Sequence, residues 1–109
     1  MSPSAGPYRH VVLFRFRPDV PEETIRGIER AFRDLARALP FVIAFEWGRN
    51  SSPEQLDRGF THCFLVTFES PAGRDAYLPH PLHQAFCRTH LDPAVEEVCV
   101  VDFLGEVGK

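Results

Sequence analysis

The segment Tyr77-Leu78-Pro79-His80-Pro81-Leu82-His83 holds one phenol and two imidazoles within seven residues. Both types of side chain can take or give a proton near neutral pH once their surroundings tune their pKa values. Pro79 and Pro81 fix the backbone and remove two N–H donors, so the segment cannot be the interior of an ordinary helix. A rigid corner that carries proton-transfer groups is a candidate active site. The alternative is a capped loop whose histidines face water.

Of the two histidines in this corner, His83 is the better candidate for a catalytic base. If Pro81 is the first helical residue, His83 lies in the first turn, where the helix dipole disfavours the imidazolium form. A neutral imidazole can remove a proton next to a carbonyl, and Tyr77 would then donate a hydrogen bond to the developing oxyanion. His80 is expected to cap the helix or to meet solvent. The two histidines stand three residues apart, as metal ligands on one helix do, but no further ligands are evident and we expect no metal.

Composition limits the classes of protein to which the chain can belong. Its 109 residues suit one domain, and 44% of them are hydrophobic, as in a folded globule. The net charge of −3 gives no electrostatic reason to expect nucleic acid or a membrane surface, and no apolar run is long enough for a membrane span. The three cysteines form no C-x-x-C pair, which favours free thiols and a cytoplasmic location. We expect a disordered lead-in over residues 1–7, one domain over 8–105 and a tail over 106–109.

Hydrophobic periodicity predicts an alternation of strands and helices. In chain order these are a strand over 8–17, a helix to about residue 39, strands over 42–48 and 60–69, helices over 71–78 and 81–90, and a strand over 95–104. Asp19 and Glu22 predict a capping box at the start of the first helix, and Leu82, Ala85 and Phe86 are expected to face inward in the last. The order β-α-β-β-α-β predicts an α+β, ferredoxin-like fold whose four-stranded antiparallel sheet has helices on one face.

Two histidines are predicted to point into the layer between the sheet and the helices. Strand alternation places His10 on the face of its strand that also carries Phe14, and His62 on the face that carries Phe64. A single histidine on an apolar face is usually a core residue, but these two lie on different strands and face the corner that holds the phenol. Asp102 lies among apolar residues, and we interpret it as a structural group that needs a partner such as an arginine.

The opposite face of the predicted sheet is apolar as well. Val11 and Leu13 alternate with the inward residues of the first strand, and Leu65 does so in the third. The helices can cover only one face, and monomeric proteins rarely expose a large apolar patch. A second copy that packs sheet against sheet would cover it, so we predict a homodimer.

The chain resembles the Dabb family, the stress-responsive dimeric α/β barrel domain, through motifs spread from Tyr8 to Phe103. These are His10-Val11-Val12-Leu13-Phe14, Trp47-Gly48, Gly59-Phe60-Thr61-His62, Thr67-Phe68-Glu69-Ser70, the corner from Tyr77 to His83 with Phe86, and Val101-Asp102-Phe103. The resemblance implies that two ferredoxin-like subunits join their sheets into a dimeric α/β barrel with the helices outside.

The resemblance also implies a site. Plant polyketide cyclases of this family close a linear polyketide thioester by intramolecular aldol condensation, without cofactor or metal. Their functional tyrosine and histidine match Tyr77 and His83, which are thus expected to be catalytic. By position, the pocket for a small apolar or aromatic ligand would be lined by His10, Val12, Phe14, Ile28, Phe32, His62, Phe64, Phe86, Val98 and Val100.

Three functions stay open at this point. The first is cofactor-free proton transfer of the polyketide-cyclase kind on a small carbonyl-containing or aromatic ligand. The second is cofactor-independent oxygenation, because small monooxygenases share the barrel architecture. The third is a non-enzymatic, stress-associated structural or binding role. An open cavity that touches Tyr77 and His83 favours an enzyme, whereas a space filled by Phe32, Phe64 and Phe86 favours the structural role.

Overall fold

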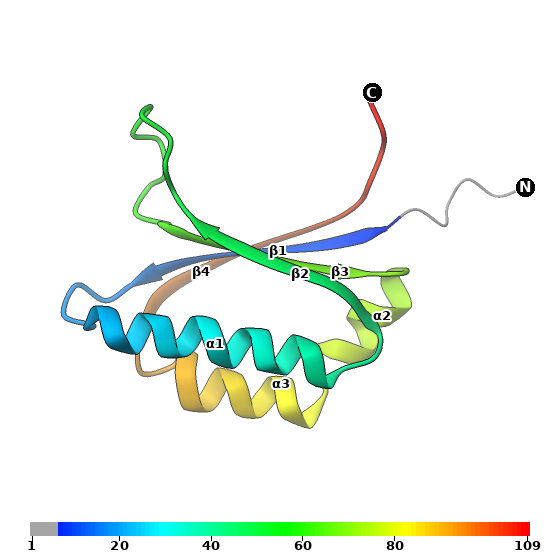
Figure 1. The fold of residues 1–109 in the computed structure, drawn as a ribbon, viewed down its shortest axis with the longest axis horizontal. Coiled ribbons are helices and arrows are strands. Elements are labelled where there is room, and N and C mark those ends of the chain that lie inside the picture. Colours follow the sequence, from blue (N-terminus) through cyan, green and yellow to red (C-terminus); the bar gives the residue numbers. More distant parts are fainter. Residues whose placement is uncertain (1–6) are drawn as a thin grey trace, which may run out of the picture.

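The computed structural model describes residues 7–109, which form a four-stranded antiparallel sheet with all helices on one face (Figure 1). The elements are β1 (Tyr8–Phe16), α1 (Glu22–Ala38), β2 (Val42–Arg49), β3 (His62–Phe68), α2 (Pro71–Tyr77), α3 (Pro81–Phe86), a π-helical turn (Cys87–Leu91) and β4 (Val95–Leu104). The strand order is β2-β3-β1-β4, so β2 and β4 are the edge strands. The predicted ferredoxin-like α+β fold is confirmed.

The predicted N-terminal lead-in lies largely outside the described residues. Of residues 1–7, the structure describes Pro7, whose carbonyl accepts a hydrogen bond of 3.1 Å from the backbone N–H of Gly105. None of the helices in the described part of the chain is long and apolar enough to cross a membrane.

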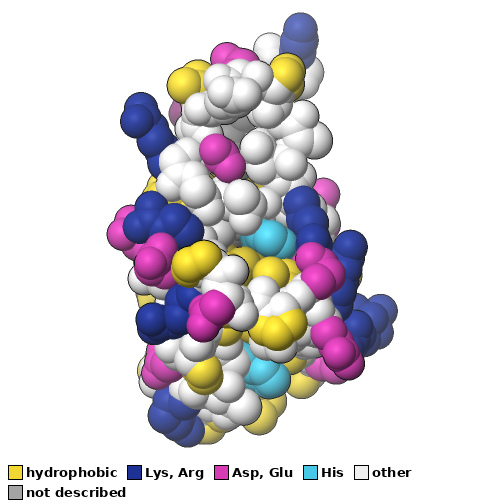
Figure 2. Space-filling view, turned by 90° about the vertical axis from the view of Figure 1, so that its left-hand side faces the viewer, with side chains coloured by type: hydrophobic (Ala, Val, Ile, Leu, Met, Phe, Trp, Pro, Cys, Tyr) yellow, Lys and Arg dark blue, Asp and Glu magenta, His cyan; other side chains and the backbone are white. Residues whose placement is uncertain are grey.

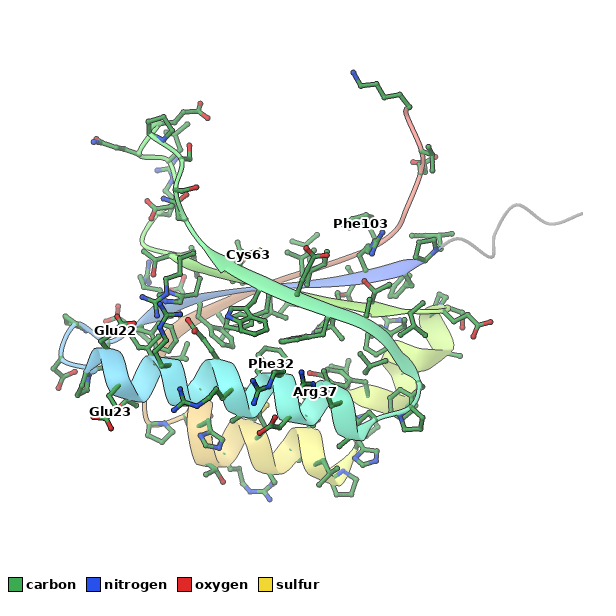
Figure 3. The ribbon with its side chains drawn as sticks, viewed as in Figure 1. Glu22, Glu23, Phe32, Arg37, Cys63 and Phe103 are labelled. Atoms are coloured by element: carbon green, nitrogen blue, oxygen red, sulfur yellow. The ribbon has the colours of Figure 1, made fainter. Side chains whose placement is uncertain are left out.

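The core lies between the sheet and α1. Val12 pairs with Phe64 and Phe14 pairs with His62, so alternate residues of β1 and β3 share the face that the helices cover. Phe14 and Phe64 are fully buried. Phe32 reaches from α1 to both of them, with ring centroids 6.2 Å and 4.8 Å away (Figure 3). Aromatic packing at these distances fixes the helix against the sheet.

Two local predictions are wrong. The N-cap of α1 is Pro21, and no side chain caps the helix, so the predicted box of Asp19 and Glu22 does not form. The carboxylate of Glu22 instead accepts hydrogen bonds from Arg49. Leu82 is 47% exposed rather than inward. His83 and Phe86 stand three residues apart and share the face of α3 toward the cavity described below, and one step of about 100° turns Leu82 away from it.

The sheet face opposite the helices is apolar, as predicted. Cys63 and Phe103 lie on this outer side (Figure 3), and Leu13 pairs with Cys63 on one side and with Cys99 on the other. Val101 and Phe103 are 55% and 47% exposed. This surface is available to a partner.

A buried ion cluster joins α1 to β2. The Glu29 side chain is 3% exposed and accepts hydrogen bonds from Arg26 at 2.8 Å and from Arg49 at 3.1 Å. Burial alone would raise the pKa of Glu29, but the two guanidinium groups outweigh it and hold the pKa below its ordinary value. On the flank that carries the start of α1, basic and acidic side chains lie next to one another at the surface (Figure 2).

Replacing this buried carboxylate should destabilise the fold. Glu29→Gln is expected to lower the free energy of unfolding by about 2 kcal/mol at neutral pH, because it removes the charge that two arginines share. A carboxyl whose pKa is lowered in the folded state loses its stabilising effect as pH falls, so the difference from wild type should shrink below pH 4.5. Urea unfolding at neutral pH and below pH 4.5 measures the loss of free energy of unfolding and its dependence on pH. Glu23→Gln, at an exposed position of the same helix, is the control, and an equal loss there would contradict the role of Glu29.

Candidate active site

A cavity of about 330 Å³ lies between the sheet and the helices α2 and α3. Its walls come from every layer of the fold and are mostly apolar: His10, Val12, Phe14, Phe32, Tyr77, Leu78, His83, Phe86, Cys87, Leu91, Asp92, Val98, Val100 and Asp102. Val98 and Val100 on the edge strand β4 are 44% and 50% exposed. The cavity therefore opens to solvent along β4, and Tyr77 and His83 both lie in its wall.

The corner between α2 and α3 fixes the orientation of His83. His80 is the N-cap of α3, as predicted, and its Nδ1 accepts a hydrogen bond of 3.1 Å from the backbone N–H of Leu82. Pro81 follows as the first helical residue, where its missing N–H costs nothing. His83 then falls in the first turn, and its Nδ1 donates to the carbonyl oxygen of Leu78 at 2.9 Å.

This hydrogen bond decides which nitrogen of His83 is basic. A carbonyl oxygen only accepts, so Nδ1 must carry the proton and Nε2 keeps its lone pair. Nε2 lies 3.6 Å from Sγ of Cys87, one helical turn further on. Burial lowers the pKa of His83, and the bond to Leu78 offsets only part of that shift. The imidazole is therefore neutral near pH 7, and its unprotonated Nε2 is the basic atom of the ring.

Tyr77 lies against this imidazole. Its side chain is 1% exposed, and its ring centroid is 4.4 Å from that of His83. Within residues 7–109 no group forms a hydrogen bond with its hydroxyl. Burial raises the pKa of Tyr77, so the phenol stays protonated and acts as a hydrogen-bond donor.

A glycine sets the position of Tyr77. Gly73 lies one turn earlier in α2, and a Cβ at this position would come within 2.9 Å of the Cβ of Phe68. Glycine thus lets α2 lie directly on β3, which brings the last residue of the helix under the sheet.

His10 belongs to a second polar arrangement in the cavity wall. Its Nδ1 donates to Asp102 at 2.6 Å, and the other carboxylate oxygen of Asp102 accepts from Arg74 at 2.9 Å. Arg74 also donates to the hydroxyl of Tyr8 at 2.8 Å. The His10 ring lies 5.6 Å from the ring of Tyr77, so the imidazoles of His10 and His83 both pack against the phenol.

Asp102 has a partner of the kind that the sequence interpretation expected, namely Arg74, but it is also part of the cavity. It lines the cavity and orients His10. The antiparallel register of β1 and β4 places His10 opposite Asp102. This juxtaposition follows from strand pairing, which the residue pattern alone did not reveal.

The structure brings most of the expected site residues together and leaves three elsewhere. His10, Val12, Phe14, Phe32, Tyr77, His83, Phe86, Val98 and Val100 line the cavity, whereas Ile28 and Phe64 lie in the core between α1 and the sheet. His62 packs edge-on against Phe16 at 4.8 Å, and its Nε2 lies 3.8 Å from Glu29 without a hydrogen bond. It belongs to the ion cluster at the start of α1.

Five lining residues were absent from the expected set, namely Leu78, Cys87, Leu91, Asp92 and Asp102. The sequence could have indicated that Cys87 belongs to the site, because Cys87 stands four residues after His83 on a predicted helix and therefore lies on the same helix face. Among residues 7–109, no three side chains of the metal-binding types gather into a set that could hold a metal ion.

The sequence matches the model of the stress responsive A/B barrel domain, Dabb, over residues 8–104. The chain therefore belongs to this family, as its fold also indicates. It is 34% identical over 103 residues to the stress-response A/B barrel domain-containing protein HS1 of Arabidopsis thaliana, and the match covers 94% of each chain.

Two relatives have names that denote an enzyme. Olivetolic acid cyclase of Cannabis sativa is 26% identical over 78 residues, which cover 72% of this chain and 77% of the cyclase. The structure of a hydroxynitrile lyase from Passiflora edulis superimposes with a TM-score of 0.83 at 26% identity, and covers 94% of this chain and 95% of the lyase.

A further solved structure bears on assembly. A dimeric ferredoxin-like protein of unknown function from Jannaschia sp. CCS1 is 31% identical, with a TM-score of 0.69, and the match covers 94% of this chain and all of the other. Dimers thus occur among the structural relatives of this chain.

The assigned tautomer and pKa shift of His83 can be measured directly. Nitrogen-15 NMR should show the proton on Nδ1 in the neutral ring, because Leu78 accepts it. The ring should titrate below 6.5, because burial disfavours the charged form. A neutral ring with the proton on Nε2, or a titration above 6.5, would contradict the geometry.

Proposed function

We propose that this protein binds a small apolar carbonyl compound in the cavity and transfers a proton next to its carbonyl group without a cofactor. One arrangement carries the proposal, namely the neutral imidazole of His83 and the protonated phenol of Tyr77 side by side in the wall of an open apolar cavity. The base is His83, and the donor is Tyr77. Phe32 and Phe86 line the cavity without filling it, which favours an enzyme over a purely structural protein.

The proposed reaction assigns one role to Nε2 of His83 and another to the hydroxyl of Tyr77. Nε2 of His83 removes a proton from the carbon next to the substrate carbonyl, and the phenol of Tyr77 donates a hydrogen bond to the enolate oxygen. The enolate carbon then attacks a second carbonyl of the same substrate, and the imidazolium returns the proton to the new alkoxide. This is an intramolecular aldol closure. The apolar walls favour a folded substrate chain and keep water away from the enolate.

The enzymes among the relatives support this chemistry. Olivetolic acid cyclase is named for ring formation and hydroxynitrile lyase for cleavage of a hydroxynitrile. Both reactions need a base beside a carbonyl or hydroxyl group. We propose the cyclase-like reaction for this chain because the motif from Tyr77 to His83 carries that resemblance. His10, held by Asp102, would orient the second carbonyl.

The His83→Ala variant tests the role of the base. With a linear poly-β-keto thioester as substrate, ring formation measured by mass spectrometry should fall at least about 100-fold, because the proton acceptor is lost. Tyr77→Phe should lower the rate and keep ligand binding, since it removes only the hydroxyl. The activity of the wild type should decline as pH falls through the lowered pKa of His83, which lies below 6.5.

His90→Ala is the matched control, because His90 packs against Phe86 from outside the cavity. It should retain ring formation. Equal rates in wild type and His83→Ala would overturn the proposed base. A ligand that raises the melting temperature of the wild type without being converted would favour the binding-protein alternative.

We further propose that the chain is a homodimer whose protomers join through the outer face of the sheet. That face carries Val101 and Phe103 with about half of each side chain exposed, and dimeric relatives share the fold. A reducing compartment such as the cytoplasm suits its three free thiols.

Val101→Asp should convert the dimer to a monomer of 12.4 kDa in sedimentation measurements, because it places a charge in the apolar interface. Leu82→Asp is the control, since Leu82 is 47% exposed on the helical side of the molecule. It should leave the dimer intact. A wild-type protein that sediments as a monomer would refute the proposed assembly.

A further inference from the structure

The aldol chemistry proposed above makes no use of Cys87, although this thiol lies in the wall of the same cavity. Cys87 lines the cavity, and its Sγ is 3.6 Å from Nε2 of His83. Since Nδ1 of His83 carries the proton, Nε2 accepts and the thiol donates. The basic nitrogen of the site is thus already directed at a nucleophile of the protein itself.

Cys87, His83 and the carbonyl of Leu78 are arranged like a nucleophile with its general base and the group that orients that base. The thiol of Cys87 contacts the imidazole of His83, and the carbonyl of Leu78 orients that imidazole through a bond of 2.9 Å. A nucleophile, a base and a group that orients the base are the geometric signature of covalent catalysis. The phenol of Tyr77 in the same cavity supplies a hydrogen-bond donor for an oxyanion.

The backbone also passes from α-helical to π-helical conformation at Cys87. The helix α3 ends at Phe86, and a π-helical turn over Cys87–Leu91 follows, closed by a bond of 2.9 Å from the N–H of Asp92 to the carbonyl of Cys87. Such wide turns are frequent at functional sites. Leu91 and Asp92 at the end of this turn also lie in the cavity wall, so the turn shapes the surroundings of the thiol.

We propose that Cys87 is a nucleophile that accepts an apolar acyl group from a thioester, with His83 as its base. Sγ attacks the carbonyl carbon of the thioester while its proton passes to Nε2 of His83. Tyr77 donates a hydrogen bond to the tetrahedral oxyanion. The bond from carbon to the departing sulfur then breaks, and the imidazolium returns the proton to the departing thiolate. One thioester replaces another, so nothing is oxidised or reduced.

The resting state of the pair is neutral. Burial raises the pKa of the Cys87 thiol and lowers that of His83, so an ion pair of thiolate and imidazolium is disfavoured. The proton moves only as the carbon–sulfur bond forms. The rate of acylation should accordingly rise with pH, because the thiolate is the stronger nucleophile.

The other two cysteines provide internal controls. Cys63 and Cys99 both pair with Leu13 and lie on the outer face of the sheet, away from the cavity. Neither belongs to the residues that line the cavity. Because the proposed dimer would cover the outer face, these two thiols serve to assign the acylated residue, and the comparison with His83→Ala reports on the site itself.

The test uses the hexanoyl thioester of N-acetylcysteamine with the full chain. Intact mass and peptide mapping should show one hexanoyl group per chain, at Cys87. Cys87→Ala should lose this group, and Cys63→Ala and Cys99→Ala should retain it. His83→Ala should slow acylation of Cys87 at least about tenfold, because the general base is gone. Thermal unfolding checks that each variant folds, and Cys87→Ser is the second variant if Cys87→Ala does not.

Acylation that is absent, equal among the three cysteines, or unchanged in His83→Ala would overturn the proposal. It shares His83 with the proposed aldol reaction, but the two can fail separately. Ring formation without acylation of Cys87 would contradict only the proposed acyl transfer. Acylation of Cys87 without ring formation would contradict only the proposed aldol reaction.

Discussion

The carbonyl oxygen of Leu78 accepts two hydrogen bonds from α3, from Nδ1 of His83 at 2.9 Å and from the side-chain amide of Gln84 at 3.0 Å. Leu78 is the C-cap of α2, and Pro79 and Pro81 keep the chain between the helices from continuing as one helix. The two bonds therefore join the helices at a fixed angle and fix the tautomer of His83 at the same time. Every chemical role proposed for the site depends on that tautomer.

Side chains alternate between the two faces of the sheet, and the two faces therefore differ in what they contact. Residues that face the helices form the core and the cavity, whereas those that face outward leave an apolar surface for a partner. Because β1 is central, it contributes to both sides, with His10 in the cavity wall and Leu13 on the outer face. A one-residue shift in register would exchange these faces, so strand pairing keeps the cavity residues and the outward apolar residues on their separate faces.

Two clusters of charge, one around a buried carboxylate and one around a half-buried carboxylate, have different surroundings and different consequences. Glu29 lies between Arg26 and Arg49 at the start of α1 and serves the stability of the fold. Asp102 lies between Arg74 and His10 in the cavity wall, where its hydrogen bond directs the other nitrogen of the imidazole away from the carboxylate. Both carboxylates are paired, as burial requires, but only the second faces space that a ligand can enter.

The sequence by itself determined the order of the elements, the ferredoxin-like class and the break between two helices at the corner from Tyr77 to His83, because hydrophobic period and proline chemistry are local properties. It also predicted that His80 either caps α3 or meets solvent, and the structure shows the cap, which is a contact between near neighbours. The tertiary structure decided which histidines share a cavity. His10 and His62 have the same pattern on their strands, yet only His10 lies beside Tyr77, and His62 lies beside Glu29. It also decided that Asp102 lies opposite His10, 92 residues apart in the chain. Contacts at this separation depend on strand register and helix placement, which no single stretch of residues encodes.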